Sequence, residues 1–254
     1  MKIALCLHGQ PRNWRPASLY LKGNVIIPYD TDIFGHTWWD ESQIGKEYGT
    51  SPWMGDRKYF ITSGDIEGLK KTYQFKEFKT DPPRNFLDEK KYKVLAPEKH
   101  DSIIDSFKSR CFSLKSVLTM TEEYEKQNNL NYDWLIISRY DVEILRMPML
   151  LALHPNKIYV ENYVHRGRKW ILNDMFIILG RKYKYIHKNL YDDFDKNWEL
   201  IQNIPDKYLS IIKGTELEHT TWVNPEEFLA FNLLFNDALE NACKIDELRV
   251  NALR

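Results

Sequence analysis

The sequence predicts a single α/β domain with a mixed sheet and helices on its flanks. Short apolar runs of strand length are separated by segments with helical periodicity. One run, Trp134–Ile137, is continuously apolar, which is typical of a strand buried on both faces. The 254 residues are 43% hydrophobic and 14% aromatic, which is enough for a full core. No repeat, low-complexity tract or linker divides the chain.

The overall composition excludes several classes of protein. Lys+Arg and Asp+Glu number 36 each, so the chain lacks the basic excess of a general nucleic-acid-binding surface. The 3 cysteines show no metal-ligand spacing and suit reduced thiols in a cytosolic protein. No apolar run approaches the ~18–20 residues of a transmembrane helix, and residues 1–7 lack the core of a secretory signal. We expect a cytoplasmic protein (in the host cytoplasm if viral), with peripheral association with a membrane as an open alternative.

The first third of the chain predicts two strands with a helix between them. Residues 2–7 form a short apolar strand that Gly9 and Pro11 bring to an end. A helix is expected within residues 16–28, and an aromatic, β-branched strand over residues 32–39. We interpret His36 as a satisfied histidine at a strand end, because no second ligand lies at metal spacing.

The middle of the chain contains its clearest helix. An irregular loop over residues 40–58 precedes a short helix at 65–72 and a strand at 75–79. The basic cluster 90–93 is interpreted as a solvated face. Residues 101–129 then carry apolar side chains at three- and four-residue steps, which predicts a helix with one face in the core.

The second half predicts two further strands and two helices. Strands are expected at residues 157–160 and 176–179, the latter directly after the polar pair Asn173 and Asp174. A helix is expected from residue 181 to about residue 190, whereas residues 192–222 show no clear period. Asn224 and Pro225, followed by Glu226 and Glu227, form a strong helix start whose capping explains one of the two glutamates.

Charged residues follow two of the predicted strands. Arg139 and Asp141 come directly after the buried strand 134–137, and Arg12 follows the first strand. Ligands of open α/β sheets bind at the carboxyl ends of strands. A carboxylate there can hold a divalent cation, which in turn can hold a diphosphate. Each strand end also has an alternative interpretation without a ligand. Arg139 and Asp141 could simply form an ion pair, and Gly9 could belong to an ordinary turn.

Taken together, the motifs of this sequence resemble those of small GT-A-type glycosyltransferases that use nucleotide sugars. The likeness is to polysaccharide and lipopolysaccharide glycosyltransferases of bacteria and large viruses. It spans most of the chain, although each motif is short. The segments that carry it are 6–12 (CLHGQPR), 32–38 (DIFGHTW), 112–115 (FSLK), 133–141 (DWLIISRYD), 173–176 (NDMF) and 225–229 (PEEFL).

The resemblance implies a GT-A-like, Rossmann-type sheet in one domain. A nucleotide-sugar-binding half would cover residues 1–145, and an acceptor-binding half residues 146–254. Residues 139–141 would take the place of the family's Asp-x-Asp motif, with Asp141 as the ligand of Mn²⁺ or Mg²⁺. Arg139 stands where the family has the first acid, and it could neutralise the diphosphate directly.

The resemblance also implies roles for other residues. The nucleotide-sugar donor would be bound by His8, Gly9, Gln10, Arg12, Lys115 and Arg139. An inverting enzyme needs a carboxylate base for the hydroxyl of its glycan or glycoconjugate acceptor. Asp174 is the first candidate for this base, and Glu226 and Glu227 come next. Two alternatives to a glycosyltransferase stay open. One is a carbohydrate- or nucleotide-binding protein without turnover, and the other is a sugar-phosphate nucleotidyltransferase, for which residues 8–12 are a poor match.

Overall fold

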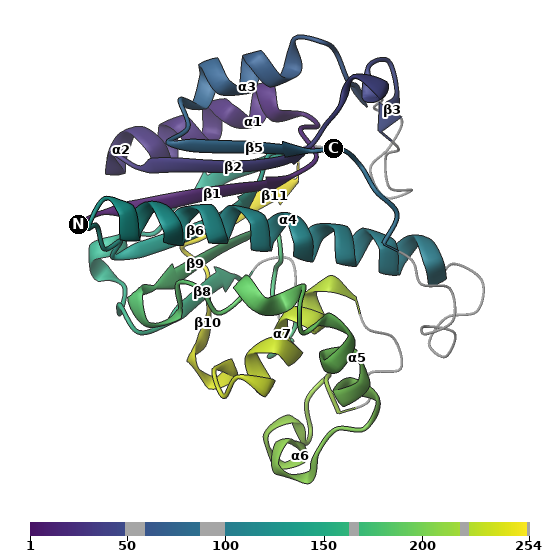
Figure 1. The fold of residues 1–254 in the computed structure, drawn as a ribbon. Coiled ribbons are helices and arrows are strands. Elements are labelled where there is room, and N and C mark those ends of the chain that lie inside the picture. Colours follow the sequence, from purple (N-terminus) through teal and green to yellow (C-terminus); the bar gives the residue numbers. More distant parts are fainter. Residues whose placement is uncertain (49–58, 87–99, 163–167, 219–223, 253–254) are drawn as a thin grey trace.

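The computed structural model is a single α/β domain around a mixed sheet of seven strands (Figure 1). It describes residues 1–48, 59–86, 100–162, 168–218 and 224–252. The strand order is β10-β8-β9-β6-β1-β2-β5. The strands are β1 (Ile3–Gly9), β2 (Asp32–Trp38), β5 (Glu77–Asp81), β6 (Trp134–Arg139), β8 (Ile158–Glu161), β9 (Phe176–Gly180) and β10 (Ala242–Ile245). All neighbours pair in parallel except β9, which is antiparallel to both β6 and β8.

Helices and two small sheets complete the domain. The small sheets pair β7 (Val142–Arg146) with β11 (Arg249–Ala252) and β3 (Glu47–Tyr48) with β4 (Tyr59–Phe60). The α-helices are α1 (Trp14–Leu21), α2 (Ile27–Tyr29), α3 (Asp65–Tyr73), α4 (His100–Gln127), α5 (Phe194–Gln202), α6 (Asp206–Ile212) and α7 (Pro225–Phe235). Five residues of π-helix, Lys22–Ile26, join α1 to α2, so this region is helical throughout.

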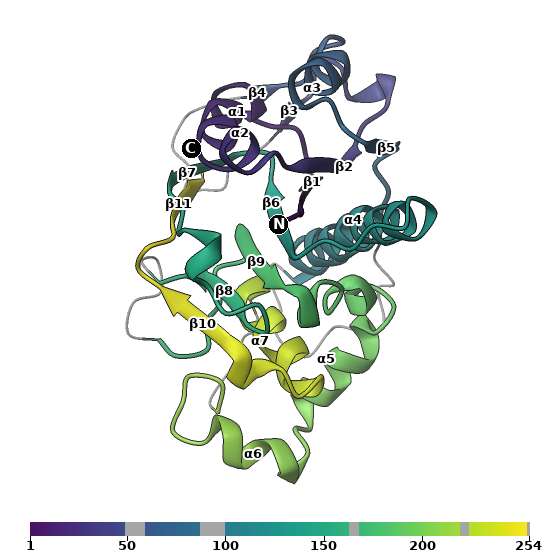
Figure 2. The ribbon, with the colours of Figure 1, turned by 90° about the vertical axis from the view of Figure 1, so that its left-hand side faces the viewer.

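The sheet has a hydrophobic core on each face, because alternate residues of its strands point in opposite directions. Ala4 and Cys6 of β1 pack toward α4, α5 and α7, whereas Ile3, Leu5 and Leu7 pack toward α1 and α3. Figure 2 shows these two groups of helices on opposite sides of the twisted sheet. The two layers explain why the strands contain continuous apolar runs.

Most of the predicted strands are confirmed. Five of the six β6 residues are buried, as predicted for a strand covered on both faces. The strands predicted at 2–7, 32–39, 75–79, 157–160 and 176–179 correspond to β1, β2, β5, β8 and β9. The sequence did not predict β7, β10 and β11. Residues 49–58 of the predicted loop and the basic cluster 90–93 lie outside the described residues.

The predictions for helices succeed where a cap or a long period is present. The helix at 101–129 is α4, and Asn224 and Glu227 form the predicted capping box of α7. The continuous helix predicted at 181–190 is wrong. This segment contains 3-10 turns, in which Ile186, Lys188 and Leu190 each donate a backbone N–H to the carbonyl three residues earlier. Helices α5 and α6 lie in the stretch where no period was recognised.

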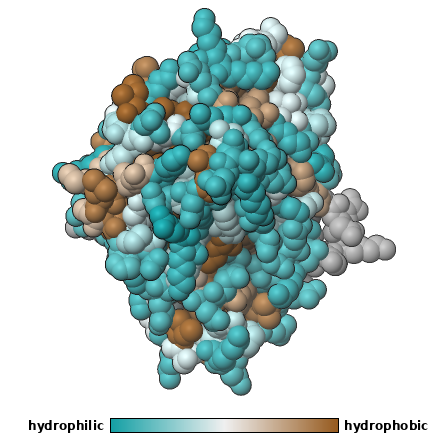
Figure 3. Space-filling view, turned by 60° about the vertical axis from the view of Figure 1, so that its left-hand side comes forward, coloured by the Kyte–Doolittle hydropathy of each residue, from teal (hydrophilic) through white to brown (hydrophobic). Residues whose placement is uncertain are grey.

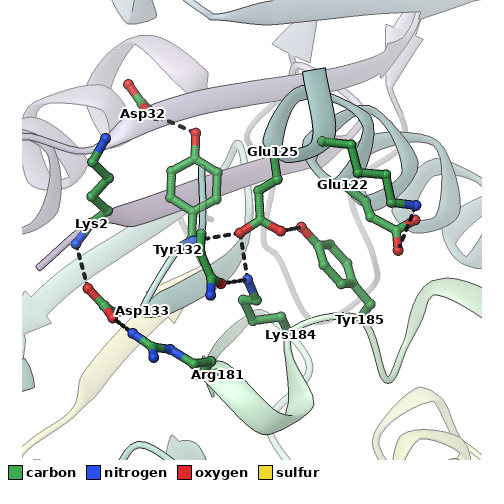
Figure 4. A network of polar contacts seen from close by, with 11 residues as sticks. Lys2, Asp32, Glu122, Glu125, Tyr132, Asp133, Arg181, Lys184 and Tyr185 are labelled. Carbon is green, nitrogen blue, oxygen red and sulfur yellow. Dashed lines mark hydrogen bonds and ion pairs between the residues drawn. The ribbon is translucent and has the colours of Figure 1, made fainter. Parts of the chain in front are cut away.

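A group of buried polar residues lies where β6 begins, and we call it the amino-edge network. Glu125 of α4 accepts hydrogen bonds from the backbone N–H of Tyr132 (2.5 Å), from Lys184 Nζ (2.5 Å) and from the Tyr185 hydroxyl (2.6 Å) (Figure 4). Lys184 Nζ also donates to Asn131 Oδ1 at 2.8 Å. Each charged group in this network is therefore paired and hydrogen-bonded, which reduces the cost of burying it.

The surface on the side where the strands begin is largely hydrophilic. Figure 3 shows hydrophilic residues over most of this face, with hydrophobic residues in small separate groups. Within the described residues, none of the helices combines the length and the apolar character needed to cross a bilayer.

Candidate functional site

The topology of the sheet makes one edge the candidate binding site. β1 lies between β2 and β6, so the chain moves to one side of β1 after the first strand and to the other side at β6. In such sheets, the crevice at the carboxyl ends of the strands where this change of direction occurs is the usual ligand site. Here His8 of β1 pairs with Arg139 of β6. Phe176, the first residue of β9, pairs with Ser138, so the segment that precedes β9 reaches the same edge.

The end of β1 is held in place by hydrogen bonds of its last residue, Gly9. Gly9 has φ +98°, and a β-carbon built on it would meet no atom within 4 Å, so the space above it is open. Its N–H donates to Ser113 Oγ of α4 at 2.9 Å, and its carbonyl accepts from Thr37 Oγ1 at 2.8 Å. A glycine is suited to this backbone conformation and to close approach of a ligand.

Asp141 lies between two arginine side chains. Arg139 donates from Nε to Oδ1 at 2.8 Å and from Nη2 to Oδ2 at 2.6 Å. Arg12 donates from Nε to Oδ2 at 2.7 Å. The alternative that Arg139 and Asp141 pair at the strand end is therefore what the structure shows, and Arg12 joins the pair from the loop after β1.

The electrostatics of this group favour its ionised form. Asp141 is 1% exposed, and burial by itself would raise the pKa of its carboxyl. Arg139 and Arg12 outweigh that effect and hold the pKa of Asp141 below its ordinary value. Conversely, burial would lower the pKa of Arg139, but Asp141 outweighs burial and raises it.

A second ion pair at the same edge joins α4 to the segment before β9. Arg110 pairs with the Asp174 carboxylate and also donates to the Asp174 backbone carbonyl. Asn173 Oδ1 accepts from the Met175 backbone N–H at 2.9 Å, which fixes the turn into β9. Burial and the nearby Arg139 lower the pKa of Arg110 to about 10, although Glu226 acts in the opposite direction.

The two glutamates at the start of α7 have different surroundings. Glu227 is the third residue of the capping box, in which its Oε2 accepts from the Asn224 backbone N–H at 3.1 Å. Burial raises the pKa of Glu227. The negative charge of Glu226 raises the pKa of both Arg110 and Arg139, so it acts on both guanidinium groups. Capping therefore explains Glu227, and Glu226 belongs with the charged groups of the candidate site.

His8 is buried among these charges. It is 1% exposed, and within the described residues neither Nδ1 nor Nε2 has a hydrogen-bond partner. Burial, reinforced by Arg110 and Arg139, lowers the pKa of His8 well below its ordinary value, so the ring is neutral at pH 7. Its neighbour His36 differs, because it bonds to Ser113 Oγ (2.7 Å) and to Asp81 Oδ2 (3.0 Å). The prediction that His36 is a satisfied strand-end histidine is confirmed.

The structure does not bring every predicted residue into this cluster. Lys115 Nζ bonds to Asp192 Oδ1 at 2.6 Å and lies over the ring of Tyr191, so its contacts differ from those of the arginines. Gln10 is exposed in the loop after β1. Sequence reasoning did not identify Arg110 as a residue of this site. Its position three residues before Ser113, and so on nearly the same face of α4, is the signal that could have found it.

The residues around Asp141 do not fit a divalent cation. Mn²⁺ and Mg²⁺ need several oxygen ligands, whereas both Asp141 oxygens already accept from guanidinium groups. Among the described residues, no three His, Cys, Asp or Glu side chains come close enough together to hold a metal ion. A cation at Asp141 would also lie against two positive charges. The assignment of Asp141 as a metal ligand stays a prediction that this arrangement does not favour.

Comparisons with known proteins return glycosyltransferases among solved structures. No protein-family model matches the sequence, and no curated protein matches it. A glycosyltransferase involved in the glycosylation of the major capsid of PBCV-1 is 8% identical, with a TM-score of 0.39 over 97% of this chain and 82% of that chain. An active-site mutant of LgtC is 13% identical, with a TM-score of 0.41 over 96% of this chain and 72% of that one.

A third structure of the same class is longer than this chain. The glycosyltransferase GlyE of Streptococcus pneumoniae TIGR4 is 9% identical, with a TM-score of 0.36 over 96% of this chain. The match covers 45% of GlyE, so this chain spans less than half of that protein's length. All three are glycosyltransferases, the class that the sequence motifs resemble. Values this low support no inference about function, which has to come from the residues of this chain.

Proposed function

We propose that this protein is a glycosyltransferase that moves a sugar from a nucleoside-diphosphate sugar to a hydroxyl of a glycan or glycoconjugate. The observation that carries the proposal is the convergence of Arg12, Arg110 and Arg139 at the edge where β1 and β6 end. Guanidinium groups match the geometry and charge of phosphates. Their position is the one at which a doubly wound sheet binds nucleotides.

The reaction requires stabilisation of a leaving nucleoside diphosphate. As the bond between the anomeric carbon and the phosphate oxygen breaks, negative charge grows on the diphosphate. Prearranged guanidinium groups lower the energy of that charge without reorganising. The open space above Gly9 lets the ligand approach the backbone at the end of β1.

Transfer also requires a group that takes the proton of the acceptor hydroxyl if the enzyme inverts the anomeric centre. Asp174 is our first candidate, because it lies beside Arg110 at the same edge of the sheet. Glu226 is the second, since its charge acts on both Arg110 and Arg139. Glu227 is a weaker candidate because its carboxylate caps α7.

The half of the chain after residue 145 contains a pocket that an acceptor could use. This open, shallow pocket of about 560 Å³ lies beside β10 and is lined by Asn162, Arg168, Lys169, Trp170, Glu240, Ala242 and Lys244. Asn173, next to Asp174, donates from Nδ2 to Glu161 Oε2 at 3.1 Å, and Glu161 influences the pKa of Lys244. The hydrogen bond between Asn173 and Glu161 of β8, and the pairing of β8 with β10, therefore connect the pocket to the segment that carries the candidate base. We propose it as the acceptor side of the enzyme.

A screen of nucleotide sugars tests the proposed function. UDP-, GDP-, CMP- and dTDP-sugars are added separately, and thermal stabilisation and donor hydrolysis are measured for each. We expect one nucleotide class to raise the melting temperature and its sugar to be hydrolysed slowly. Stabilisation without any turnover, in the presence of glycan acceptors, would indicate a binding protein. No stabilisation by any nucleotide would reject the proposal.

A further inference from the structure

We infer that the diphosphate of the donor is bound directly by the guanidinium groups of Arg12, Arg110 and Arg139, without a divalent cation on Asp141. The inference rests on the proposed function, because it concerns how that donor is bound. It assigns Asp141 the role of a counter-charge to two of these arginines and not that of a metal ligand. It also names His8 as a further contact for the ligand.

The bonds of Asp141 are the first support. Its carboxylate accepts three charged hydrogen bonds of 2.6–2.8 Å from two guanidinium groups. A cation could coordinate this carboxylate only if these bonds were broken, and two buried positive charges would then lose their partner. Breaking a buried pair in this way is costly.

The unused donors of the arginines are the second support. Arg12 reaches Asp141 through Nε alone, so within the described residues its two Nη groups have no protein acceptor. The Arg12 side chain is 24% exposed, and those of Arg139 and Arg110 are 21% exposed. Each of these side chains is thus held by a carboxylate and stays partly exposed to solvent. A phosphate oxygen can accept from their remaining N–H donors without displacing Asp141 or Asp174.

His8 gives an independent indication that a ligand binds here. A buried polar group without a partner carries a desolvation cost, and its occurrence in a native fold calls for an explanation. Both ring nitrogens of His8 lack a partner within the described residues, His8 pairs with Arg139 across β1 and β6, and the charges of Arg110 and Asp141 also act on its ring. We call Arg12, Arg110 and Arg139 the arginine cluster. A phosphate or sugar oxygen bound there would accept a hydrogen bond from the ring N–H of His8. The same ligand would therefore accept hydrogen bonds from the arginines and from the histidine.

The test begins with the wild-type protein and two probes. UDP and inorganic pyrophosphate are titrated calorimetrically, once with EDTA and once with MnCl₂, and Mn²⁺ is titrated into the protein–UDP complex. Other nucleoside diphosphates replace UDP if the screen above prefers another base. We expect the dissociation constant with EDTA to lie within about twofold of that with Mn²⁺, because charged hydrogen bonds supply the affinity. A gain of tenfold or more with Mn²⁺ would overturn the inference but leave the proposed function intact. Absence of binding under both conditions would count against both.

Two variants separate the roles of the charges. Arg139→Lys keeps the charge but loses the planar fork, and we expect about tenfold weaker binding with EDTA. Asp141→Asn removes the charge that competes with the ligand, so nucleotide affinity with EDTA should be retained or higher. A metal site predicts the reverse for Asp141→Asn, with weaker binding and loss of any response to Mn²⁺.

A matched control guards against unfolding and against general charge effects. Arg181 pairs with Asp133 where β6 begins, at the other end of the sheet. Arg181→Lys makes the same chemical change there and should leave nucleotide affinity unchanged. Melting temperatures of all variants are measured first. If Asp141→Asn does not fold, the comparison of EDTA with Mn²⁺ on the wild-type protein still decides between the two modes of binding.

Discussion

Both ends of the sheet contain charged residues that are buried or partly buried. The two ends differ in how fully the hydrogen-bonding groups of these residues are paired within the protein. At the beginning of β6, Glu125 accepts three hydrogen bonds and Lys184 donates two, with side-chain exposures of 9% and 8% (Figure 4). At the end of β6, Arg12, Arg110 and Arg139 are each paired yet 21–24% exposed, and His8 has no partner in the described part of the chain.

This difference supports the proposal that the arginine cluster, and not the amino-edge network, binds a ligand. A buried ion pair is by itself weak evidence for function, because structural pairs are also buried. The amino-edge network has its hydrogen bonds completed within the protein, which indicates a structural role. The arginine cluster retains accessible donors and an unsatisfied imidazole, which indicates a role in binding.

The largest expected effect concerns the candidate base at the arginine cluster. Asp174→Asn should lower transfer to an acceptor by roughly 10²–10⁴-fold, the usual contribution of a positioned base, while nucleotide still binds. Steady-state transfer and calorimetric binding are measured well below the melting temperature. Glu226→Gln is the matched comparison and should cost less than the Asp174 change. If the larger loss falls on Glu226→Gln, Glu226 is the base and Asp174 has a structural role.

A substitution in the amino-edge network should lower the stability of the protein and leave nucleotide binding unchanged. Glu125→Gln preserves the shape but leaves Lys184 as an uncompensated buried charge, which typically costs about 3–5 kcal/mol of unfolding free energy. Denaturant unfolding measures the loss, and UDP titration of the folded variant should give the wild-type dissociation constant. A variant with normal stability and weakened UDP binding would remove the contrast between the two ends of the sheet.

Acid should destabilise the protein through its buried histidines. Burial lowers the pKa of His36 to about 4, despite the opposing effect of the hydrogen bond that His36 Nε2 donates to Asp81. The unfolded chain therefore binds a proton near pH 6.5, whereas folded His36 does not until about pH 4. The contribution of neutral His36 to the free energy of unfolding is fully present above pH 6.5. It is lost as the pH is lowered toward 4, and the loss for this residue is about 3 kcal/mol. Melting temperatures over this range measure the slope, which His36→Gln should reduce; an unchanged slope would contradict this assignment.

The smallest expected effect is the removal of one arginine from the cluster. Arg12→Ala should weaken nucleotide binding by about 1.5–3 kcal/mol if its hydrogen bond to the ligand is charged. Arg139 still neutralises Asp141 in this variant, so folding should be preserved. Arg15→Ala is the control. Arg15 lies three residues after Arg12 but pairs with Asp65. Equal affinities for wild type and Arg12→Ala would exclude Arg12 from the site.

The sequence predicted the parts of the molecule that depend on local patterns. The apolar run of β6, the cap of α7 and the glycine after β1 are all readable from neighbouring residues. The sequence also placed Arg12, Arg139, Asp141 and Asp174 at strand ends, which the parallel and antiparallel pairings then bring to one edge.

The remaining features depend on contacts between distant segments. The sequence could not show that Arg12 reaches Asp141, because 129 residues separate them. The 3-10 turns at 181–190 replace the predicted helix, and Lys184 within them bonds to Glu125, a partner 59 residues away. Strand β10 is short and only partly buried, so it lacks the apolar signal of the central strands.

Helix α4 carries contacts to both ends of the sheet. Arg110 and Ser113 contact the carboxyl edge, and Glu125 contacts the opposite one, fifteen residues or about 22 Å from Arg110 along the helix axis. Its hydrogen exchange should therefore be uniform and slow over residues 110–125, because neither end can open without losing contacts to a strand. The geometry of the arginine cluster then persists for as long as the whole domain stays folded, and is lost with it in one cooperative step.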